Sequence, residues 1–85
     1  MSEQEMKLGR TLGSSALFIY QALKFAPEST LSELELETRI NMKTVRKHLK
    51  SLMECNVVIK REVLGTYNES FAFRSNDDHN SWKLH

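Results

Sequence analysis

Residues 42–55, MKTVRKHLKSLMEC, combine two faces of opposite chemistry, and they constrain the fold of this 85-residue chain more than any other segment. The apolar residues follow the helical spacing i, i+4, i+7, i+8, at Val45, Leu49, Leu52 and Met53. The basic residues fall on the other side of the helix, at Lys43, Arg46, Lys47 and Lys50. We therefore predict an amphipathic helix with one buried stripe and one cationic face, capped at its start by Asn41.

A second helix is predicted over residues 14–26, SSALFIYQALKFA. Ser14 or Ser15 is expected to cap it, and Pro27 ends it because the residue before a proline is forced out of helical geometry. Its apolar residues cover nearly the whole circumference, so we expect a second copy of the chain to cover part of it, although a central helix buried within one monomer remains the alternative. The expected dimer contacts are Leu17, Phe18 and Phe25.

A short helix is predicted over residues 32–39, where Ser32 and Glu35 match a capping box. Residues 1–13 show no sustained period, so we expect a loose N-terminal arm there. Two leucines of this arm are expected to lie against the core, namely Leu8 and Leu12.

A β-hairpin is predicted after the basic helix. Residues 57–63 are rich in β-branched side chains, and residues 70–74 place Phe71 and Phe73 on one face of a strand. Asn56 suits a left-handed helix end. The turn formers between the strands are Gly65 and Asn68. The predicted fold class is mainly α with a small β-hairpin, in one domain over residues 14–75 that is followed by a polar tail over 76–85.

The net charge of +1 conceals three blocks of different sign. Residues 1–38 carry a charge of −3, residues 39–61 carry +6, and residues 62–85 carry −2. A local excess of this size predicts a surface that binds anions, nucleic acid among them, although a solvated helix face would show the same charges.

Residues 30–61, TLSELELETRINMKTVRKHLKSLMECNVVIKR, resemble the winged helix-turn-helix of bacterial and archaeal transcription regulators. The matching positions are Leu31, Ser32, Glu33 and Leu34, then Thr44, Val45, Leu49 and Leu52, then Asn56, Val57 and Val58. The chain departs from the family pattern at Glu35, Thr38 and Arg39, where a small residue, an apolar residue and a turn glycine are usual. The resemblance implies three helices plus a two- to three-stranded wing sheet.

The resemblance also implies sequence-specific binding to double-stranded DNA by a small dimeric transcription regulator. Helix 42–55 would lie in the major groove, with Arg46 reading a base edge and with its positive N-terminus near a phosphate. The expected DNA-binding residues are Lys43, Thr44, Arg46, Lys47, Lys50, Lys60, Arg61, Tyr67 and Asn68. The alternative is a winged-helix module that binds proteins without DNA contact, and the tail with Trp82 and Leu84 would suit a protein partner.

Other function classes have weaker signals. A single cysteine, Cys55, excludes an internal disulfide and fits a reducing cytoplasm. No secretory leader or membrane span is recognisable, so we expect a cytoplasmic protein, free in the host cytoplasm or associated with the nucleoid. We expect no enzyme and no cofactor, because no motif brings a nucleophile and a base together and the chain is short for a catalytic domain with a cofactor site. We expect no metal site at Asp77, Asp78, His79 and His85, because the two histidines lie in a polar tail without helical ligand spacing.

Overall fold

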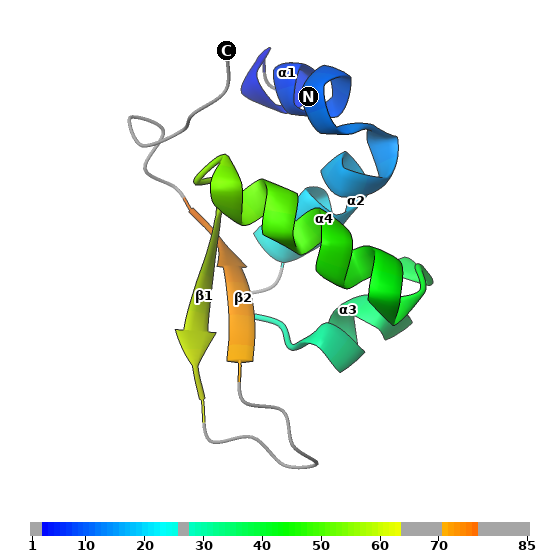
Figure 1. Cartoon of the computed structure of the whole chain (residues 1–85), viewed down its shortest axis with the longest axis vertical. Helices are drawn as coiled ribbons and strands as arrows, with labels where there is room; N and C mark the ends of the chain where they lie inside the picture. The colour runs from blue at the N-terminus through cyan, green and yellow to red at the C-terminus, as the bar shows by residue number, and fades with distance from the viewer. Residues whose placement is uncertain (1–2, 26–27, 64–70, 77–85) are drawn as a thin grey trace.

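A computed structural model describes residues 3–25, 28–63 and 71–76 of the chain. These residues form four helices and a two-stranded antiparallel sheet (Figure 1). The elements are α1 (Glu3–Leu12), α2 (Ser14–Phe25), α3 (Leu31–Thr38), α4 (Met42–Glu54), β1 (Val58–Glu62) and β2 (Phe71–Ser75). The predicted class, mainly α with a small hairpin, is confirmed, but the helix count is four and not three.

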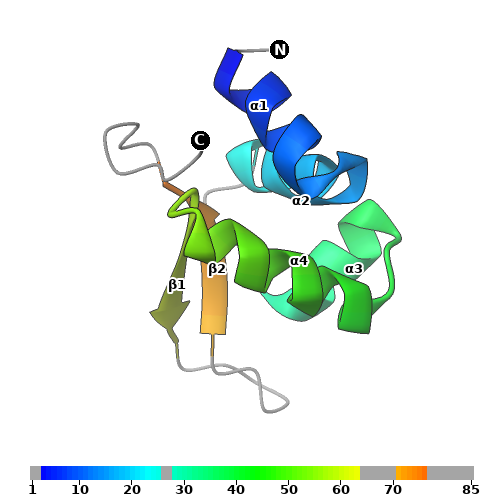
Figure 2. The ribbon, with the colours of Figure 1, turned by 45° about the horizontal axis from the view of Figure 1, so that its top comes forward.

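The N-terminal residues form a helix, so the prediction of a loose arm was wrong. Helix α1 packs on α2, at the end of the molecule opposite the C-terminal end of β1 (Figures 1 and 2). Leu8 is fully buried and Leu12 is half-buried against the core, as expected. The acidic residues Glu3 and Glu5 in the first turn, with Arg10 in the last, also suit the helix dipole. Few apolar residues mark this helix, and for that reason periodicity did not reveal it.

Helix α2 begins at a glycine junction and not at a serine cap. Gly13 has φ of 96°, and its N–H donates to the carbonyl of Gly9 at 2.9 Å, which ends α1. The carbonyl of Gly13 then accepts from the N–H of Leu17 at 3.2 Å, which starts α2. Ser14 already lies in the first turn of α2. A left-handed glycine therefore joins the two helices without a connecting loop.

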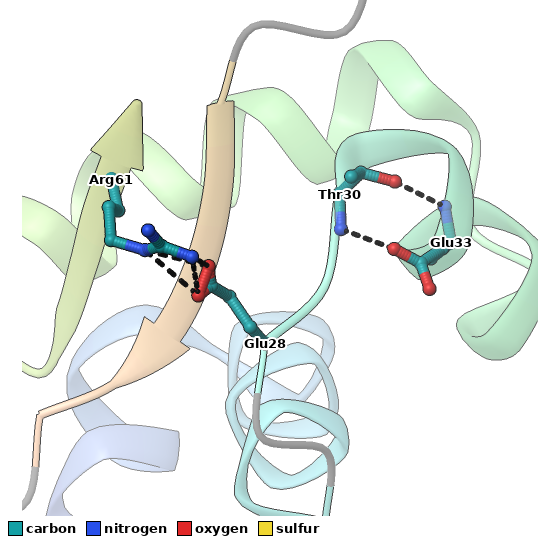
Figure 3. A network of polar contacts seen from close by, with 4 residues as sticks. All are labelled: Glu28, Thr30, Glu33 and Arg61. Atoms are coloured by element: carbon teal, nitrogen blue, oxygen red, sulfur yellow. Dashed lines mark hydrogen bonds and ion pairs between the residues drawn. The ribbon is translucent and has the colours of Figure 1, made fainter. Parts of the chain in front are cut away.

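Helix α3 is capped by a pair of residues two positions before the predicted pair. The Glu33 N–H donates to Thr30 Oγ1 at 3.3 Å, and the Thr30 N–H donates to Glu33 Oε1 at 3.0 Å (Figure 3). This is a complete capping box, but the predicted box of Ser32 and Glu35 was wrong. Glu35 has a different role, described below.

The sheet follows the predicted hairpin closely. Val58 pairs with Ser75 and Glu62 pairs with Phe71 in an antiparallel register. Asn56 takes the left-handed conformation expected of it, with φ of 66°. Ser29, just before α3, adds an isolated bridge to β2, since its N–H donates to the Phe73 carbonyl at 2.9 Å and its carbonyl accepts at 2.7 Å. The sheet thus has two strands, and the segment at Ser29 adds a single bridge to β2.

One apolar core joins all these elements. It contains the predicted stripe of α4 together with one side of α2 and residues from α1, α3 and the sheet. Its buried members are Leu8, Ala16, Ile19, Tyr20, Leu23, Leu34, Val45, Leu49, Leu52, Val57, Val58 and Phe73.

Candidate nucleic-acid interface

Helix α4 separates its apolar and basic residues as predicted. Val45, Leu49 and Leu52 are buried, with no more than 1% of any of them exposed. The five polar residues predicted to contact DNA on this helix are all exposed, namely Lys43, Thr44, Arg46, Lys47 and Lys50. Four cations therefore lie on the solvent side of one rigid element.

Among the described residues, no acid neutralises the cations of α4. Within residues 3–25, 28–63 and 71–76, the ion pairs are Lys24 with Glu5 and Arg61 with Glu28. In that part of the chain, no cation of α4 forms an ion pair with a carboxylate. Their charge is therefore available to an external anion.

Glu35, Thr38 and Arg39 hold the turn that positions α4. The Glu35 carboxylate accepts from the N–H of Met42 at 2.8 Å. The Thr38 hydroxyl donates to the Leu34 carbonyl at 2.7 Å, and it accepts from Ile40 N–H at 3.3 Å. Arg39 closes α3 in the left-handed conformation, with φ of 58°. Side-chain hydrogen bonds of Glu35 and Thr38, together with the backbone conformation of Arg39, thus fix this turn.

The N-terminus of α4 has less capacity for a phosphate than we expected. Asn41 accepts from the N–H of Lys43 at 2.8 Å, which confirms the predicted cap. The Glu35 carboxylate already occupies the N–H of Met42 and the positive end of the helix dipole. The side chains of α4, and not its first backbone N–H groups, therefore dominate this surface.

The two predicted cations of β1 lie on opposite faces of the sheet. Lys60 and Phe73 are register partners, and the Lys60 ammonium lies 4.4 Å from the ring centre of Phe71, on the face toward α4. Arg61 points to the other face, where its guanidinium donates four hydrogen bonds of 2.7–3.1 Å to the Glu28 carboxylate (Figure 3). Strand alternation therefore separates Arg61 from the basic face of α4.

The Glu28–Arg61 pair has matched electrostatic shifts. The hydrogen bond from Arg61 lowers the pKa of Glu28, and the charges of Arg61 and Arg74 lower it further. The same hydrogen bond raises the pKa of Arg61. Both groups are therefore held in their charged forms, and Arg61 is already paired within the chain.

A groove of about 620 Å³ separates α4 from the sheet. Its cations are Lys43, Arg46, Lys47, Lys50 and Lys60, and its apolar residues are Leu31, Leu49, Met53, Phe71 and Phe73. Periodicity assigned the side chains of α4 and the two phenylalanines of β2 to faces, but it did not reveal the groove. The groove depends on the spacing between two elements, which a single sequence does not encode locally.

No protein-family model matches the chain, and neither does any curated protein. The fold and its surfaces therefore carry the functional argument. Among the described helices, none has the length and apolar character needed to cross a bilayer. The described residues also contain no cluster of three metal-ligating side chains.

The remaining predicted residues fall in different environments. Tyr67 and Asn68 lie outside the described residues, and so does the predicted tail over 76–85 apart from Asn76. The prediction was wrong for Asn76, which is buried and donates to the carbonyls of Val57 and Asn56. In α2, Phe18 and Phe25 are 49% and 89% exposed. Leu17 is half-buried, and a β-carbon added to Gly9 of α1 would lie 3.0 Å from Leu17 Cδ2. Helix α1 therefore supplies, within one chain, part of the cover that we had assigned to a partner.

Proposed function

We propose that the chain binds double-stranded DNA in a sequence-specific manner, with α4 in the major groove. The observation that carries this proposal is the cationic face of α4, whose four basic side chains are exposed and have no ion pair among the described residues. A helix of this width fits the major groove of B-DNA. On the side of α4 opposite the cations, the buried apolar stripe fixes the helix to the core.

The order of the elements supports a winged helix-turn-helix arrangement. Helices α3 and α4 are joined by a short turn and pack on each other, and the hairpin of β1 and β2 follows directly. The bridge between Ser29 and Phe73 gives the sheet a third pairing segment just before α3, as in a wing sheet of three segments. In this arrangement α1 is an additional helix that precedes the motif.

The individual side chains have distinct roles in this proposal. Arg46 is our candidate for base reading, because a guanidinium can donate two parallel hydrogen bonds to guanine. Lys43, Lys47 and Lys50 would contact phosphates, which position the protein without specifying sequence. Lys60 faces the same side from the sheet, whereas Arg61 contributes little because Glu28 holds it.

The biological role that fits is a small transcription regulator in the cytoplasm that works as a homodimer. The exposed rings of Phe18 and Phe25 on α2 supply the dimer contact in this proposal. Two copies bound to one duplex would read two half-sites of a palindrome. Occlusion or recruitment of polymerase would follow from that occupancy.

Fluorescence anisotropy with a random DNA duplex tests the proposal. If each protomer neutralises about four phosphates, the logarithm of the dimer's affinity should fall against the logarithm of salt with a slope of about −7 between about 50 and 200 mM. Lys47→Glu should weaken binding to every duplex. Lys7→Glu makes the same charge change on an exposed residue of α1 that does not line the groove, so this variant should bind DNA much more tightly than Lys47→Glu. Equal affinity of the two variants would refute the role of α4.

Selection of bound sites from random duplexes tests sequence specificity. A palindromic consensus would support both base reading and a dimer. Arg46→Ala should relax the preference at one base position in each half-site, at a cost of about 1–3 kcal/mol for the preferred base. A pool that shows no enrichment over unselected DNA would leave only non-specific binding.

One observation favours the alternative, a module that binds proteins without DNA contact. Leu36 on α3 is 79% exposed, and a large exposed apolar side chain suits a protein interface. The salt dependence discriminates between the two functions, because counterion release makes DNA binding steeply sensitive to salt.

A further inference from the structure

We propose that the groove between α4 and the sheet also binds an acidic peptide with apolar side chains, contributed by a partner protein. The surface in question joins the cations of α4 and Lys60 to an apolar floor. The docking itself does not depend on DNA binding. Its consequence, displacement of DNA from α4, rests on the proposed function.

The floor of the groove is more apolar than phosphate contacts require. Phe71 is 40% exposed, and Leu31 and Met53 beside it are half-buried. Three large apolar side chains that share one concave surface lose water when an apolar ligand covers them. A DNA backbone offers charge but few apolar groups, so DNA alone leaves this floor unused.

The rim of the groove specifies an anionic occupant. Lys43, Lys47 and Lys50 follow each other along one side of α4 over seven residues, a distance of about 10 Å. Lys60 lies across the groove on β1. Within the described part of the chain, none of these rim cations forms an ion pair. An occupant must therefore present acids on both sides of an apolar centre.

A peptide meets these requirements better than a small carboxylate. A single carboxylate can satisfy one or two cations, whereas the row on α4 continues over two helical turns. An amphipathic peptide offers acids every three or four residues beside an apolar stripe of matching length. The groove is also partly open to solvent, which suits the exposed outer face of a peptide.

The same cations cannot serve DNA and the peptide at once. Lys43, Lys47 and Lys50 are the proposed phosphate contacts, and all three line the groove. A bound acidic peptide would place carboxylates where phosphates would otherwise lie. A partner protein with such a segment would therefore act as an inhibitor of DNA binding.

Anisotropy with two synthetic peptides and the full chain tests the docking directly, without DNA. One labelled peptide of about 15 residues has Leu and Phe at helical spacing among glutamates, and the other has the same glutamates with Ser in place of each Leu and Phe. We expect the first to bind at least about tenfold more tightly. Equal affinities would overturn the proposal, because charge alone would then explain the binding.

Matched variants locate the peptide. Phe71→Ser should weaken binding of the amphipathic peptide about tenfold, whereas Met6→Ser on α1, where the side chain is 48% exposed, should leave it unchanged. Lys50→Glu should also weaken it, and Lys7→Glu should have a much smaller effect; since these exposed residues lie outside the core, this pair does not depend on how Phe71→Ser folds. Unchanged affinity in both Phe71→Ser and Lys50→Glu would overturn the proposal.

Two further measurements distinguish peptide docking from binding of a small amphiphile and from the proposed DNA binding. Decanoate that binds to the groove while neither peptide does would make the occupant a small amphiphile and overturn the proposal. Addition of the amphipathic peptide to the protein–duplex complex should release DNA. If the protein binds the peptide but not DNA, the docking proposal is supported and the proposed function is refuted. If the protein binds DNA but not the peptide, the proposed function is supported and the docking proposal is refuted.

Discussion

Glu28 and Arg61 form a bidentate ion pair on the face of the sheet away from α4, and the pair makes stability depend on pH. The folded pKa of Glu28 lies below its ordinary value of 4.5, chiefly because Arg61 donates hydrogen bonds to the carboxylate. A carboxyl group with a lowered folded pKa stabilises the protein above its unfolded pKa. That contribution is lost as the pH falls through the lowered folded pKa.

Arg61→Gln should therefore lower the midpoint of thermal unfolding at pH 7, and the difference from the parent should shrink as the pH falls below 4.5. The effect should be small, because both side chains are partly open to solvent. Lys7→Gln, an exposed cation without an ion pair among the described residues, is the control and should not show this pH dependence. A difference between Arg61→Gln and the parent that is independent of pH would contradict the assignment.

Arg39 has a left-handed conformation that a side chain disfavours. With φ of 58°, its strain costs about 1–2 kcal/mol, and glycine would remove it. Glycine also increases the conformational entropy of the unfolded chain, which offsets about 0.5–1 kcal/mol of that gain. The net effect of Arg39→Gly should be a rise of about 0.5–1 kcal/mol in the free energy of unfolding. Urea titration measures the change. Asn56→Gly, at φ of 66°, should gain less because asparagine tolerates this region, and destabilisation by Arg39→Gly would refute the argument.

At the scale of elements, α1 tests whether the N-terminal residues belong to the folded unit. Leu8 is fully buried in the common core. Leu8→Ala should lower the free energy of unfolding by about 2–5 kcal/mol, since it leaves a cavity between α1 and α2. Met6→Ala, on the exposed side of the same helix, should change it by less than about 1 kcal/mol. Equal, small effects from the two variants in chemical denaturation would mean that α1 is only an arm.

The elements that periodicity predicted best are those with the sharpest contrast between their faces. Helix α4 alternates buried Val45 and Leu49 with exposed cations, so its faces were predicted correctly, although Met53 is only half-buried. The predicted bounds, 42–55, extend one residue past the end of the helix. Helix α1 has few apolar residues, and its main apolar anchor, Leu8, is buried among core residues that other elements supply. Helix propensity without an apolar stripe is a weak local signal, and here the tertiary contact decides.

The site shows the same division between local and non-local information. The exposure of Lys47 and its neighbours follows from the helical spacing of apolar and basic residues in α4. Strand alternation likewise places Lys60 and Arg61 on opposite sides of the sheet. The pairing of Arg61 with Glu28 joins residues 33 positions apart in the chain. Nothing near either residue encodes that contact, and a count of basic residues therefore overestimates the cations free to bind an anion.

At the scale of the whole molecule, the exposed side of α2 determines the predicted assembly. Phe18 and Phe25 are seven residues apart, so they lie on the same face of α2, about two turns apart. Helix α1 covers the side of α2 that carries Leu17, and the core covers Leu23 and its neighbours. Two large exposed rings remain on one element, and a two-fold contact between copies of α2 would remove both from water.

We therefore expect a dimer at micromolar concentration in sedimentation velocity, and a monomer for the double variant Phe18→Ser/Phe25→Ser. Leu36→Ser changes an apolar residue on α3 whose exposure, 79%, lies between those of Phe18 and Phe25, and it should leave the dimer intact. Because a monomer engages half as many phosphates, the salt slope of DNA binding should fall from about −7 to about −4 in the double variant. A parent chain that sediments as a monomer would refute the dimer. If the double variant is still a dimer, a surface other than Phe18 and Phe25 must join the two copies.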